Sequence, residues 1–416
     1  ICITNDVVRT FTANGLLAIG ASPVMSECSE DLKDLIAHAS ALLINIGTLT
    51  PDKVSYYKDA IALAKKHEVP IVLDPVGCHA GVYRLSVVLD LIKTDAISLL
   101  RGNQSEIKAI YDALNTNHKV NNSLSGKGVD GEQVEDSAII TYRLARQINC
   151  PVVATGEEDY VSDGTRVFAV LHGHPIMTAV TGTGCLLGAV LAAFFSSYCP
   201  FMYNMSIGEF LAYALAYYGL AGESAVNVSG VKPGSFSMAF MDALYEFDDA
   251  MLLSENRIRP VVVPDQLKVY FISGTQDVGF NESHLLDIVE AACRGGATCF
   301  QFREKGIGTL EGQQKLELAQ QLKEICAMYN VLYIINDDVD LAVAVNADGV
   351  HVGQEDMRLE DVRNLVGNKV VGISIHSVEE LHKTDVVYAD CVGVGPMYAT
   401  SSKPDAQERS EEHTSE

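Results

Sequence analysis

The chain has 416 residues, which suggests two or three domains, and 48% of them are hydrophobic while only 20% are charged. Lys+Arg 30 against Asp+Glu 54 gives a formal net charge of -24, which argues against partners such as nucleic acid or an anionic membrane surface. The 10 cysteines form no C-x-x-C pair and are scattered through apolar segments, so we expect reduced, buried thiols in a cytoplasmic protein. The most apolar window, 185–196, is too short to span a bilayer. The partners that we expect are small-molecule substrates.

Strand and helix patterns alternate through the first half of the chain. Strands are predicted at 41–46, 69–73, 96–100 and 151–155, with helical patterns between them. A hairpin with a type I′ turn at Asp163-Gly164 and three long helical segments, to about residue 253, follow. This order predicts an α/β domain with a largely parallel sheet, which binds ligands at the carboxyl ends of its strands.

Polar residues gather at those predicted strand ends. They occur in N-I-G-T at 45–48, D-P-V-G at 74–77, R-G-N-x-x-E at 101–106 and T-G-E at 155–157. Within 178–192, a Thr-rich turn with Gly182 and Gly184 leads into an apolar helical run, with Cys185 in the first turn of the helix. The start of such a helix favours an anion and a cysteine thiolate in its first turn. Taken alone, each of these polar segments is more often only the turn between a strand and a helix, with no role in ligand binding. Together they supply what phosphoryl transfer requires: a cation for nucleotide phosphates in Arg101, carboxylates for Mg²⁺ in Asp74 and Glu106, and an anion site with a possible base at 182–185.

Several runs in this half resemble hydroxyethylthiazole kinases. They are C-I-T-N-D-V-V at 2–8, F-T-A-N-G-L-L-A-I-G-A-S-P-V-M at 11–25, D-P-V-G at 74–77, R-G-N-x-x-E at 101–106, D-Y-V-S-D-G at 159–164 and V-T-G-T-G-C-L-L at 180–187. The resemblance implies a ribokinase-like fold, a homotrimer, and ATP- and Mg²⁺-dependent phosphorylation of 4-methyl-5-(2-hydroxyethyl)thiazole. It also implies residue roles: thiazole contacts from Met25 and Gly182, ATP contacts from Arg101 and Thr155, Mg²⁺ at Asp74 and Glu106, and Cys185 as a base or as a group that positions the hydroxyl.

A second β/α rhythm begins near residue 268. Strands are predicted at 269–272, 298–302, 331–335, 349–352, 370–373 and 391–394, a spacing typical of a TIM (β/α)8 barrel. Arg303 and Lys305 lie two apart in an extended segment, so both could face one anion. Asp337 and Asp356, after neighbouring strands, are a candidate Mg²⁺ pair.

This half resembles thiamine-phosphate synthases. The matching runs are Q-F-R-E-K at 301–305, I-I-N-D at 334–337, G-V-H-V-G-Q-E-D at 349–356, G-I-S-I-H-S at 372–377 and G-P-M-Y-A-T-S-S-K-P-D-A at 395–406. The resemblance implies coupling of the thiazole phosphate to a hydroxymethylpyrimidine diphosphate, so that the two halves carry out consecutive steps of thiamine biosynthesis. The implied roles are pyrimidine diphosphate binding by Gln301, Arg303, Lys305, Asn336, Ser374 and Lys403, Mg²⁺ binding by Asp337 and Asp356, and thiazole phosphate binding by Thr400 and Ser402.

We therefore expect four segments. They are a kinase-like domain at 1–258 that lacks its natural N-terminus, a linker at 259–267, about six of eight β/α units of a barrel at 268–406, and a tail at 407–416 that looks like a translated sequencing adapter. An unclosed barrel would leave this chain without the synthase activity. Two alternatives stay open: a ribokinase-like kinase of another small alcohol, disfavoured by Cys185 where sugar kinases carry Asp, and a non-catalytic thiazole-binding module, disfavoured by the retained carboxylates.

Overall fold

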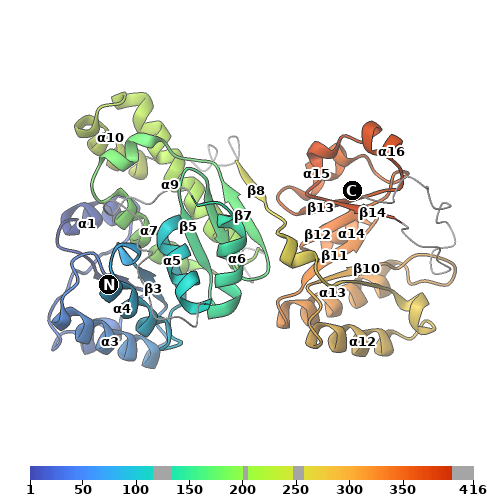
Figure 1. Ribbon diagram of the computed structural model, residues 1–416, viewed down its shortest axis with the longest axis horizontal. Coiled ribbons are helices and arrows are strands. Elements are labelled where there is room, and N and C mark those ends of the chain that lie inside the picture. The colour runs from blue at the N-terminus through green and yellow to red at the C-terminus, as the bar shows by residue number, and fades with distance from the viewer. Residues whose placement is uncertain (116–133, 200–204, 247–256, 396–416) are drawn as a thin grey trace. The chain divides into compact units, whose positions relative to one another are not determined.

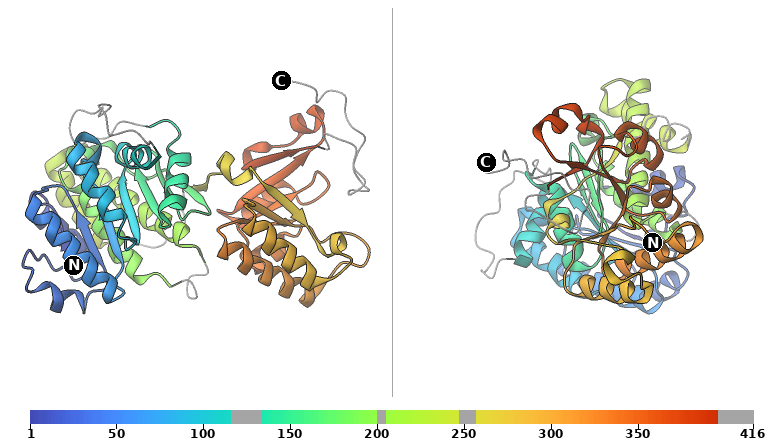
Figure 2. Two further views of the ribbon diagram at one scale, coloured as in Figure 1. Left: turned by 60° about the horizontal axis from the view of Figure 1, so that its bottom comes forward. Right: turned by 90° about the vertical axis from the view of Figure 1, so that its right-hand side faces the viewer.

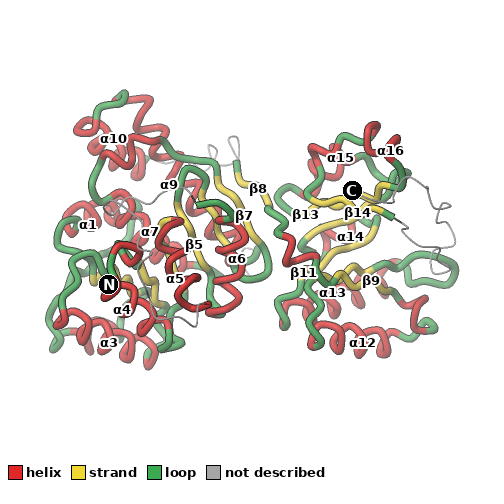
Figure 3. Tube along the Cα trace, viewed as in Figure 1, coloured by secondary structure: helices red, strands yellow, loops and turns green. Residues whose placement is uncertain are grey.

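The protein is described here from a computed structural model that covers residues 1–115, 134–199, 205–246 and 257–395 (Figures 1 and 3). The chain divides into two compact units, Ile1–Arg259 and Pro260–Glu416.

The first unit is built on an eight-stranded sheet in which the strands follow one another in chain order. The first five strands pair in parallel, and β6 and β7 continue the sheet as an antiparallel hairpin. The strands are β1 (Cys2–Ile3), β2 (Leu42–Asn45), β3 (Ile71–Asp74), β4 (Leu99–Asn103), β5 (Val152–Thr155), β6 (Asp159–Ser162), β7 (Val167–Val170) and β8 (Ile258–Pro260).

Helices cover both faces of this sheet (Figure 2). Successive strand residues point to opposite faces, so Leu43 packs in one core and Leu42 and Ile44 in the other. One face carries α1 (Arg9–Ala18), α7 (Thr183–Ser197), α9 (Ile207–Ser229) and α10 (Pro233–Tyr245), and the other carries α2 (Leu32–Ile36), α3 (Pro51–Lys66), α4 (Val82–Ile92), α5 (Gln104–Asn115) and α6 (Ser137–Ile148).

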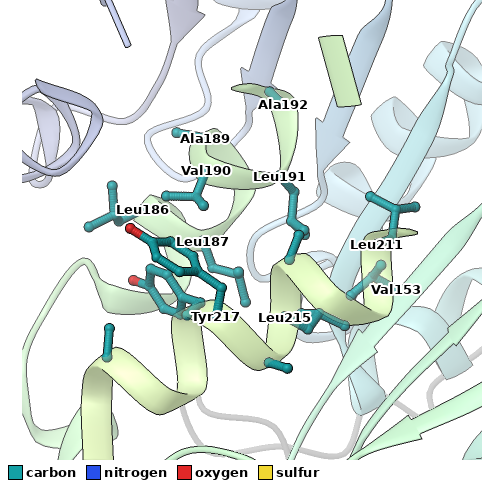
Figure 4. Packing of buried hydrophobic residues seen from close by; sticks show 14 of the residues in the cluster. Val153, Leu186, Leu187, Ala189, Val190, Leu191, Ala192, Leu211, Leu215 and Tyr217 are labelled. Carbon is teal, nitrogen blue, oxygen red and sulfur yellow. The ribbon is translucent and has the colours of Figure 1, made fainter. Parts of the chain in front are cut away.

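Helix α7 is apolar on nearly every side because it lies between the sheet and α9. Figure 4 shows side chains of α7, such as Leu187 and Leu191, facing Leu211 and Leu215 of α9, with Val153 of β5 nearby. This packing buries α7 from Leu186 to Ala192 and fixes its first turn against the carboxyl ends of the parallel strands.

Two predicted details in this unit are wrong. Residues 101–103 end β4 as strand, since Arg101, Gly102 and Asn103 pair with β5; they do not stop it. The turn of the β6–β7 hairpin is not type I′, which would require positive φ at both central residues, whereas only Gly164 has it. The Asp163 carboxylate instead accepts the backbone N–H groups of Thr165 and Arg166 at 3.0 and 2.8 Å.

Strand β8 lies next to β7 in the sheet and is held there by side chains as well as by the backbone. The N–H of Leu171 donates to the carbonyl of Arg257 at 3.1 Å. The guanidinium groups of Arg257 and Arg259 pair with Glu223 and Glu158 respectively. The segment that leaves the first unit is therefore part of its sheet.

The second unit contains a six-stranded, all-parallel sheet in its described residues, with the strands again in chain order. The larger core lies between the sheet and helices on one of its faces. This is the arrangement of consecutive β/α units of a barrel. The strands are β9 (Tyr270–Ser273), β10 (Cys299–Phe302), β11 (Leu332–Asn336), β12 (Gly349–Val352), β13 (Val370–Ile375) and β14 (Cys391–Val394), and the helices between them are α12 (Glu282–Arg294), α13 (Gly312–Met328), α14 (Val339–Ala344), α15 (Leu359–Val366) and α16 (Val378–Lys383).

All ten cysteines are free thiols, and six of them are buried. Cys28 departs from the expectation of buried cysteines because it is exposed. Within the described part of the chain, the structure has no helix that is both long and apolar enough to cross a bilayer.

Candidate active site

A row of hydrogen-bonded side chains crosses the carboxyl ends of the five parallel strands of the first unit. Asn5, just after β1, donates from Nδ2 to Oδ1 of Asn45 at 3.0 Å, and Asn45 Nδ2 donates to Oδ2 of Asp74 at 2.8 Å. Arg101 on β4 continues the row, with Nη1 3.5 Å from the same Asp74 oxygen and Nη2 donating to Thr155 Oγ1 at 3.0 Å. Parallel strands in chain order bring these five residues to one edge of the sheet.

Glu106, in the first turn of α5, is held by backbone groups of two different loops. Its Oε1 accepts the N–H of Gly77 and its Oε2 accepts the N–H of Asn103, each at 2.7 Å. The N–H of Glu106 in turn donates to Asn103 Oδ1 at 2.8 Å, a reciprocal pair of the capping-box kind. Each carboxylate oxygen still has lone pairs that could serve a cation.

Asp74 and Glu106 are buried carboxyl groups whose acidity is weakened. Burial raises the pKa of Asp74 to about 6, and it outweighs the opposing effects of Arg101 and Asn45. Burial, followed by repulsion from Asp74, raises the pKa of Glu106 to about 7. The Oδ1 atom of Asp74 is buried and has no hydrogen-bond partner among the residues that the structure describes. Two adjacent carboxylates with a spare buried oxygen fit a hard divalent cation such as Mg²⁺, which prefers oxygen ligands and keeps several waters.

The start of α7 faces this row. Gly182 precedes the helix with φ +102°, and the N–H of Leu186 donates to its carbonyl at 2.7 Å. The N–H groups of the preceding helical residues have no carbonyl partner within the helix. A Cβ at Gly184 would lie 3.6 Å from Arg101 Nη2, so the guanidinium sits directly beside this helix start. Backbone donors, a helix dipole and a buried cation together form a site suited to a phosphoryl group.

Cys185 lies in the first turn of α7, and its sulfur accepts a hydrogen bond from Asn5 Nδ2 at 3.3 Å. Burial, aided by the negative charge of Asp74, raises the pKa of the Cys185 thiol to about 11. The predicted stabilisation of a thiolate at the helix start is therefore wrong here, because burial of the sulfur disfavours its charged form more than Asn45, Arg101 and Asn5 favour it. At neutral pH the group is a thiol, which favours a positioning role over a role as base.

Of the two predicted thiazole contacts, Met25 follows a residue paired with β1 and Gly182 lies beside α1. The N–H of Cys2 donates to the carbonyl of Val24 at 2.9 Å, which holds the segment with Met25 along β1. Met25 is half-buried against the core that contains α7. A Cβ at Gly182 would lie 3.0 Å from Phe11 Cδ1 and 3.1 Å from Val8 Cγ1, so α1 and the start of α7 touch at this glycine.

In the second unit, a charged group forms at the ends of β10, β11 and β12. Lys305 Nζ donates to Asp337 Oδ2 at 2.7 Å. Burial raises the pKa of Asp337, and the neighbouring carboxylate of Asp356 acts in the same direction while Lys305 opposes it. Asp356 accepts the N–H of Gly353 at 2.7 Å. The predicted Asp337–Asp356 pair is thus close together beside a cation, as a site for a metal-bound anion requires.

The other predicted residues of this unit are distributed over the same sheet. Gln301 is buried and donates to Tyr270 OH at 3.1 Å, and Ser374 Oγ lies 3.0 Å from His351 Nε2. Arg303 and Asn336 follow at the ends of their strands. The remaining predicted residues, Thr400, Ser402 and Lys403, lie outside the described residues.

Sequence reasoning missed the parts that orient the predicted side chains. In the sequence, Asn45 is one of several polar residues at predicted strand ends, and Asn5 is part of the run C-I-T-N-D-V-V at 2–8, with no separate indication of its role. Asn103, Gly77 and Glu304 were given no role, although Glu304 accepts the N–H groups of Thr275 and Leu310 at 2.8 and 2.9 Å and so ties two loops of the second unit together. The sequence signal for Asn5 and Asn45 is their place at the carboxyl ends of parallel strands, Asn45 as the last residue of β2 and Asn5 two residues after β1.

Comparison with known proteins agrees with this division. The hydroxyethylthiazole kinase family matches residues 1–250, and the thiamine monophosphate synthase family matches residues 269–416. A hydroxyethylthiazole kinase of Streptococcus agalactiae is 48% identical over 256 residues, which cover 61% of this chain and 95% of that protein. The solved structure of a hydroxyethylthiazole kinase protein from Pyrococcus horikoshii superposes with a TM-score of 0.55 at 36% identity, covering 63% of this chain and 92% of the other.

A relative that spans both units comes from Symbiobacterium thermophilum. This thiamine biosynthesis bifunctional protein ThiM/ThiE is 36% identical over 415 residues, which cover 98% of this chain and 82% of the relative. Taken with the two family matches and the two sites described above, the chain belongs to the family of bifunctional thiamine biosynthesis proteins, with a hydroxyethylthiazole kinase domain followed by a thiamine-phosphate synthase domain.

Proposed function

We propose that the first unit transfers the γ-phosphoryl group of ATP to the hydroxyl of 4-methyl-5-(2-hydroxyethyl)thiazole at the carboxyl ends of β1–β5. The hydroxyl oxygen forms a bond to the γ-phosphorus while the bond from that phosphorus to the β–γ bridging oxygen breaks. The bridging oxygen keeps the electron pair and leaves with ADP, and the hydroxyl proton passes to solvent. Little covalent chemistry is required of the protein, so positioning and charge stabilisation dominate.

Each residue of the site has a role in this proposal. Arg101 holds phosphate oxygens, with Thr155 fixing its guanidinium. The N–H groups at the start of α7 hold the transferred group. Asp74 and Glu106 would hold Mg²⁺, which supplies charge neutralisation of the phosphates when bound. Cys185, as a thiol, contacts the substrate hydroxyl and orients it.

The observation that carries the proposal is the placement of Arg101 between Asp74 and the start of α7. A buried guanidinium, a carboxylate with a free buried oxygen and an open helix start within contact of one another are the parts of a phosphate and metal site. The kinase family to which this unit belongs supports the same reaction class.

The test is an assay of ATP-dependent phosphorylation of hydroxyethylthiazole by the 416-residue chain and by Cys185→Ala. We expect turnover in the wild type and a fall in kcat of about 10- to 100-fold in the variant, because the hydroxyl loses its positioning contact. Cys199→Ala, which removes a thiol just beyond the other end of α7, is the matched control and should keep wild-type kcat. Faster turnover of another small alcohol would redirect the proposal to that substrate.

We propose that the second unit couples the thiazole phosphate to the pyrimidine diphosphate, with expulsion of diphosphate. Asp337 and Asp356 would hold Mg²⁺ beside Lys305 and Arg303, and Gln301, Asn336 and Ser374 would hold the pyrimidine substrate. The close Lys305–Asp337–Asp356 group supports this assignment. An assay of thiamine phosphate formation by the 416-residue chain tests this proposal. It also tests the expectation that an unclosed barrel leaves the chain without synthase activity, which turnover would contradict. Lys305→Met should then raise the KM for the diphosphate substrate.

We further propose a cytoplasmic homotrimer assembled through the first unit. Large apolar side chains exposed around the end of α9 and on α10 support a subunit contact there: Val228, Val231, Met238 and Tyr245 are 71–82% exposed. Light scattering after size exclusion tests the trimer. The double variant Met238→Asp, Tyr245→Asp should have a smaller mass than the wild type. A wild-type mass equal to that of a single chain would overturn the proposal.

A further inference from the structure

Two buried amides connect the helix start that carries Cys185 to the carboxylate on β3. Asn5 Nδ2 donates both to Cys185 Sγ at 3.3 Å and to Asn45 Oδ1 at 3.0 Å. Asn45 Nδ2 then donates to Asp74 Oδ2 at 2.8 Å. Asn45 is fully buried and Asn5 is nearly so. An unbroken path of three hydrogen bonds therefore joins the thiol to the carboxylate.

The orientation of both amides is fixed by their surroundings. The N–H of Gly47 donates at 3.0 Å to Asn45 Oδ1, and an N–H must meet an oxygen, so the Asn45 nitrogen has to face Asp74. The same Asn45 oxygen requires a donor from Asn5, so the Asn5 nitrogen faces both Asn45 and the sulfur. Because both hydrogens of Asn5 Nδ2 are engaged, the sulfur is an acceptor there and its own S–H remains free to point elsewhere.

The side chain of Asn5 packs directly against the backbone of Gly47. A Cβ at Gly47 would lie 2.7 Å from Asn5 Cβ and 2.8 Å from Asn5 Cγ and Nδ2. Only a glycine at position 47 leaves room for this side chain. The Gly47 backbone thus supports the pair twice: its N–H orients Asn45, and its missing side chain admits Asn5.

We propose that Asn5 and Asn45 are positioning residues for phosphoryl transfer, which hold the sulfur of Cys185 at a fixed separation from the carboxylate of Asp74. The inference rests on the proposed function, in which the substrate hydroxyl lies at Cys185 and the metal at Asp74. In that arrangement the amide pair sets the distance between the attacking oxygen and the phosphoryl group. An error of about 1 Å in such a distance can cost about 100-fold in rate.

The test is a double-mutant cycle in the full chain: wild type, Asn5→Ala, Cys185→Ala and both together. If Asn5 acts through the sulfur, Asn5→Ala lowers kcat by about 10- to 100-fold and leaves the KM for the thiazole alcohol and for ATP within about threefold. In the Cys185→Ala background the same change has no sulfur left to misplace, and kcat should stay within about twofold. Equal kcat losses in both backgrounds, or a rise in KM alone, would overturn the amide role.

Gly47→Ala is the second variant, because Asn5→Ala could unfold the domain. It retains every polar group but displaces Asn5, so we expect the same loss of kcat with unchanged KM. Gly81→Ala is its matched control, since a Cβ there meets nothing nearer than 3.8 Å and the backbone is extended. Wild-type kcat in Gly47→Ala, with a wild-type melting temperature, would refute the inference. A Cys185→Ala chain with full activity is a different failure, that of the proposed role of Cys185.

Discussion

The contact between α1 and the start of α7 gives a sharp prediction for Gly182→Ala. This glycine has φ +102°, a conformation that costs a residue with a Cβ about 1–2 kcal/mol. The new Cβ would also lie 3.0 Å from Phe11 Cδ1 and 3.1 Å from Val8 Cγ1, tighter than ordinary packing. We take about 1–3 kcal/mol for such overpacking. The first unit should therefore lose about 2–5 kcal/mol of its free energy of unfolding.

Gly164→Ala is the matched control because it separates backbone strain from the steric contact. Gly164 has φ +87°, but the nearest atoms to its Cβ position lie 3.6 Å away, in ordinary contact. It should lose only the backbone cost, about 1–2 kcal/mol, and keep wild-type kcat. Gly182→Ala should also lower kcat, because relief of the clash shifts the turn that carries Cys185.

Calorimetric melting of the full chain and steady-state assays of the kinase step would measure both quantities. The calorimetric transition of the first unit is expected to fall by about 2–4 °C for each kcal/mol lost. Equal destabilisation of the two variants, together with full activity of Gly182→Ala, would refute the packing of α1 on this helix start as the origin of the effect.

Three further predictions follow from the buried polar groups. Arg101→Met should lower the free energy of unfolding of the first unit by about 3–5 kcal/mol, because it leaves the buried charge of Asp74 unpaired. The double variant Arg101→Met, Asp74→Leu should regain part of that loss, and urea unfolding of the two variants measures the difference. Without metal, the free energy of unfolding should fall as pH rises from about 4 to about 7, because the pKa values of Asp74, raised to about 6, and Glu106, raised to about 7, make the folded state bind protons that the unfolded state has already released. Glu106→Gln should flatten the profile, and a stability that rose with pH in both chains would contradict this. Tyr218→Phe removes the bond from its hydroxyl to the Thr183 carbonyl at 2.6 Å and should cost about 0.5–1.5 kcal/mol, which an unchanged melting curve would disprove.

Most of the fold could be predicted from the sequence because the strands of both sheets are short apolar runs between helical patterns. β12 and β14 have the predicted bounds, since an aspartate precedes each strand and a glycine follows it. The predicted end of β4 at residue 100 is wrong because the polar residues Arg101 and Asn103 resemble the start of a loop in the sequence. In the fold, the backbone of these residues pairs with β5 while their side chains point into the site. Polar residues needed at the site therefore continue the strand beyond the end of its apolar run.

The candidate site could be predicted as a location but not as a network. Chain-order pairing of parallel strands brings Asp74, Arg101 and Thr155 together whatever their detailed contacts, so their neighbourhood follows from topology. The donor from Asn5 to Cys185 joins residues 180 positions apart, and no local pattern encodes it. The pKa of the Cys185 thiol is raised mainly by burial, and the depth of that burial depends on the packed structure and not on any local pattern.

The position of β8 determines where the chain can be cleaved without damage to the sheet of the first unit. Because Arg257 and Arg259 are clasped by Glu223 and Glu158, the last residues of the first unit are needed to finish its sheet. A protease site placed before position 257 would strip that strand and leave the edge at β7 open to pairing between molecules. A site between positions 260 and 264 would leave the strand in place. The boundary between the two units thus falls at the end of β8, and separate expression of either unit should begin or end there.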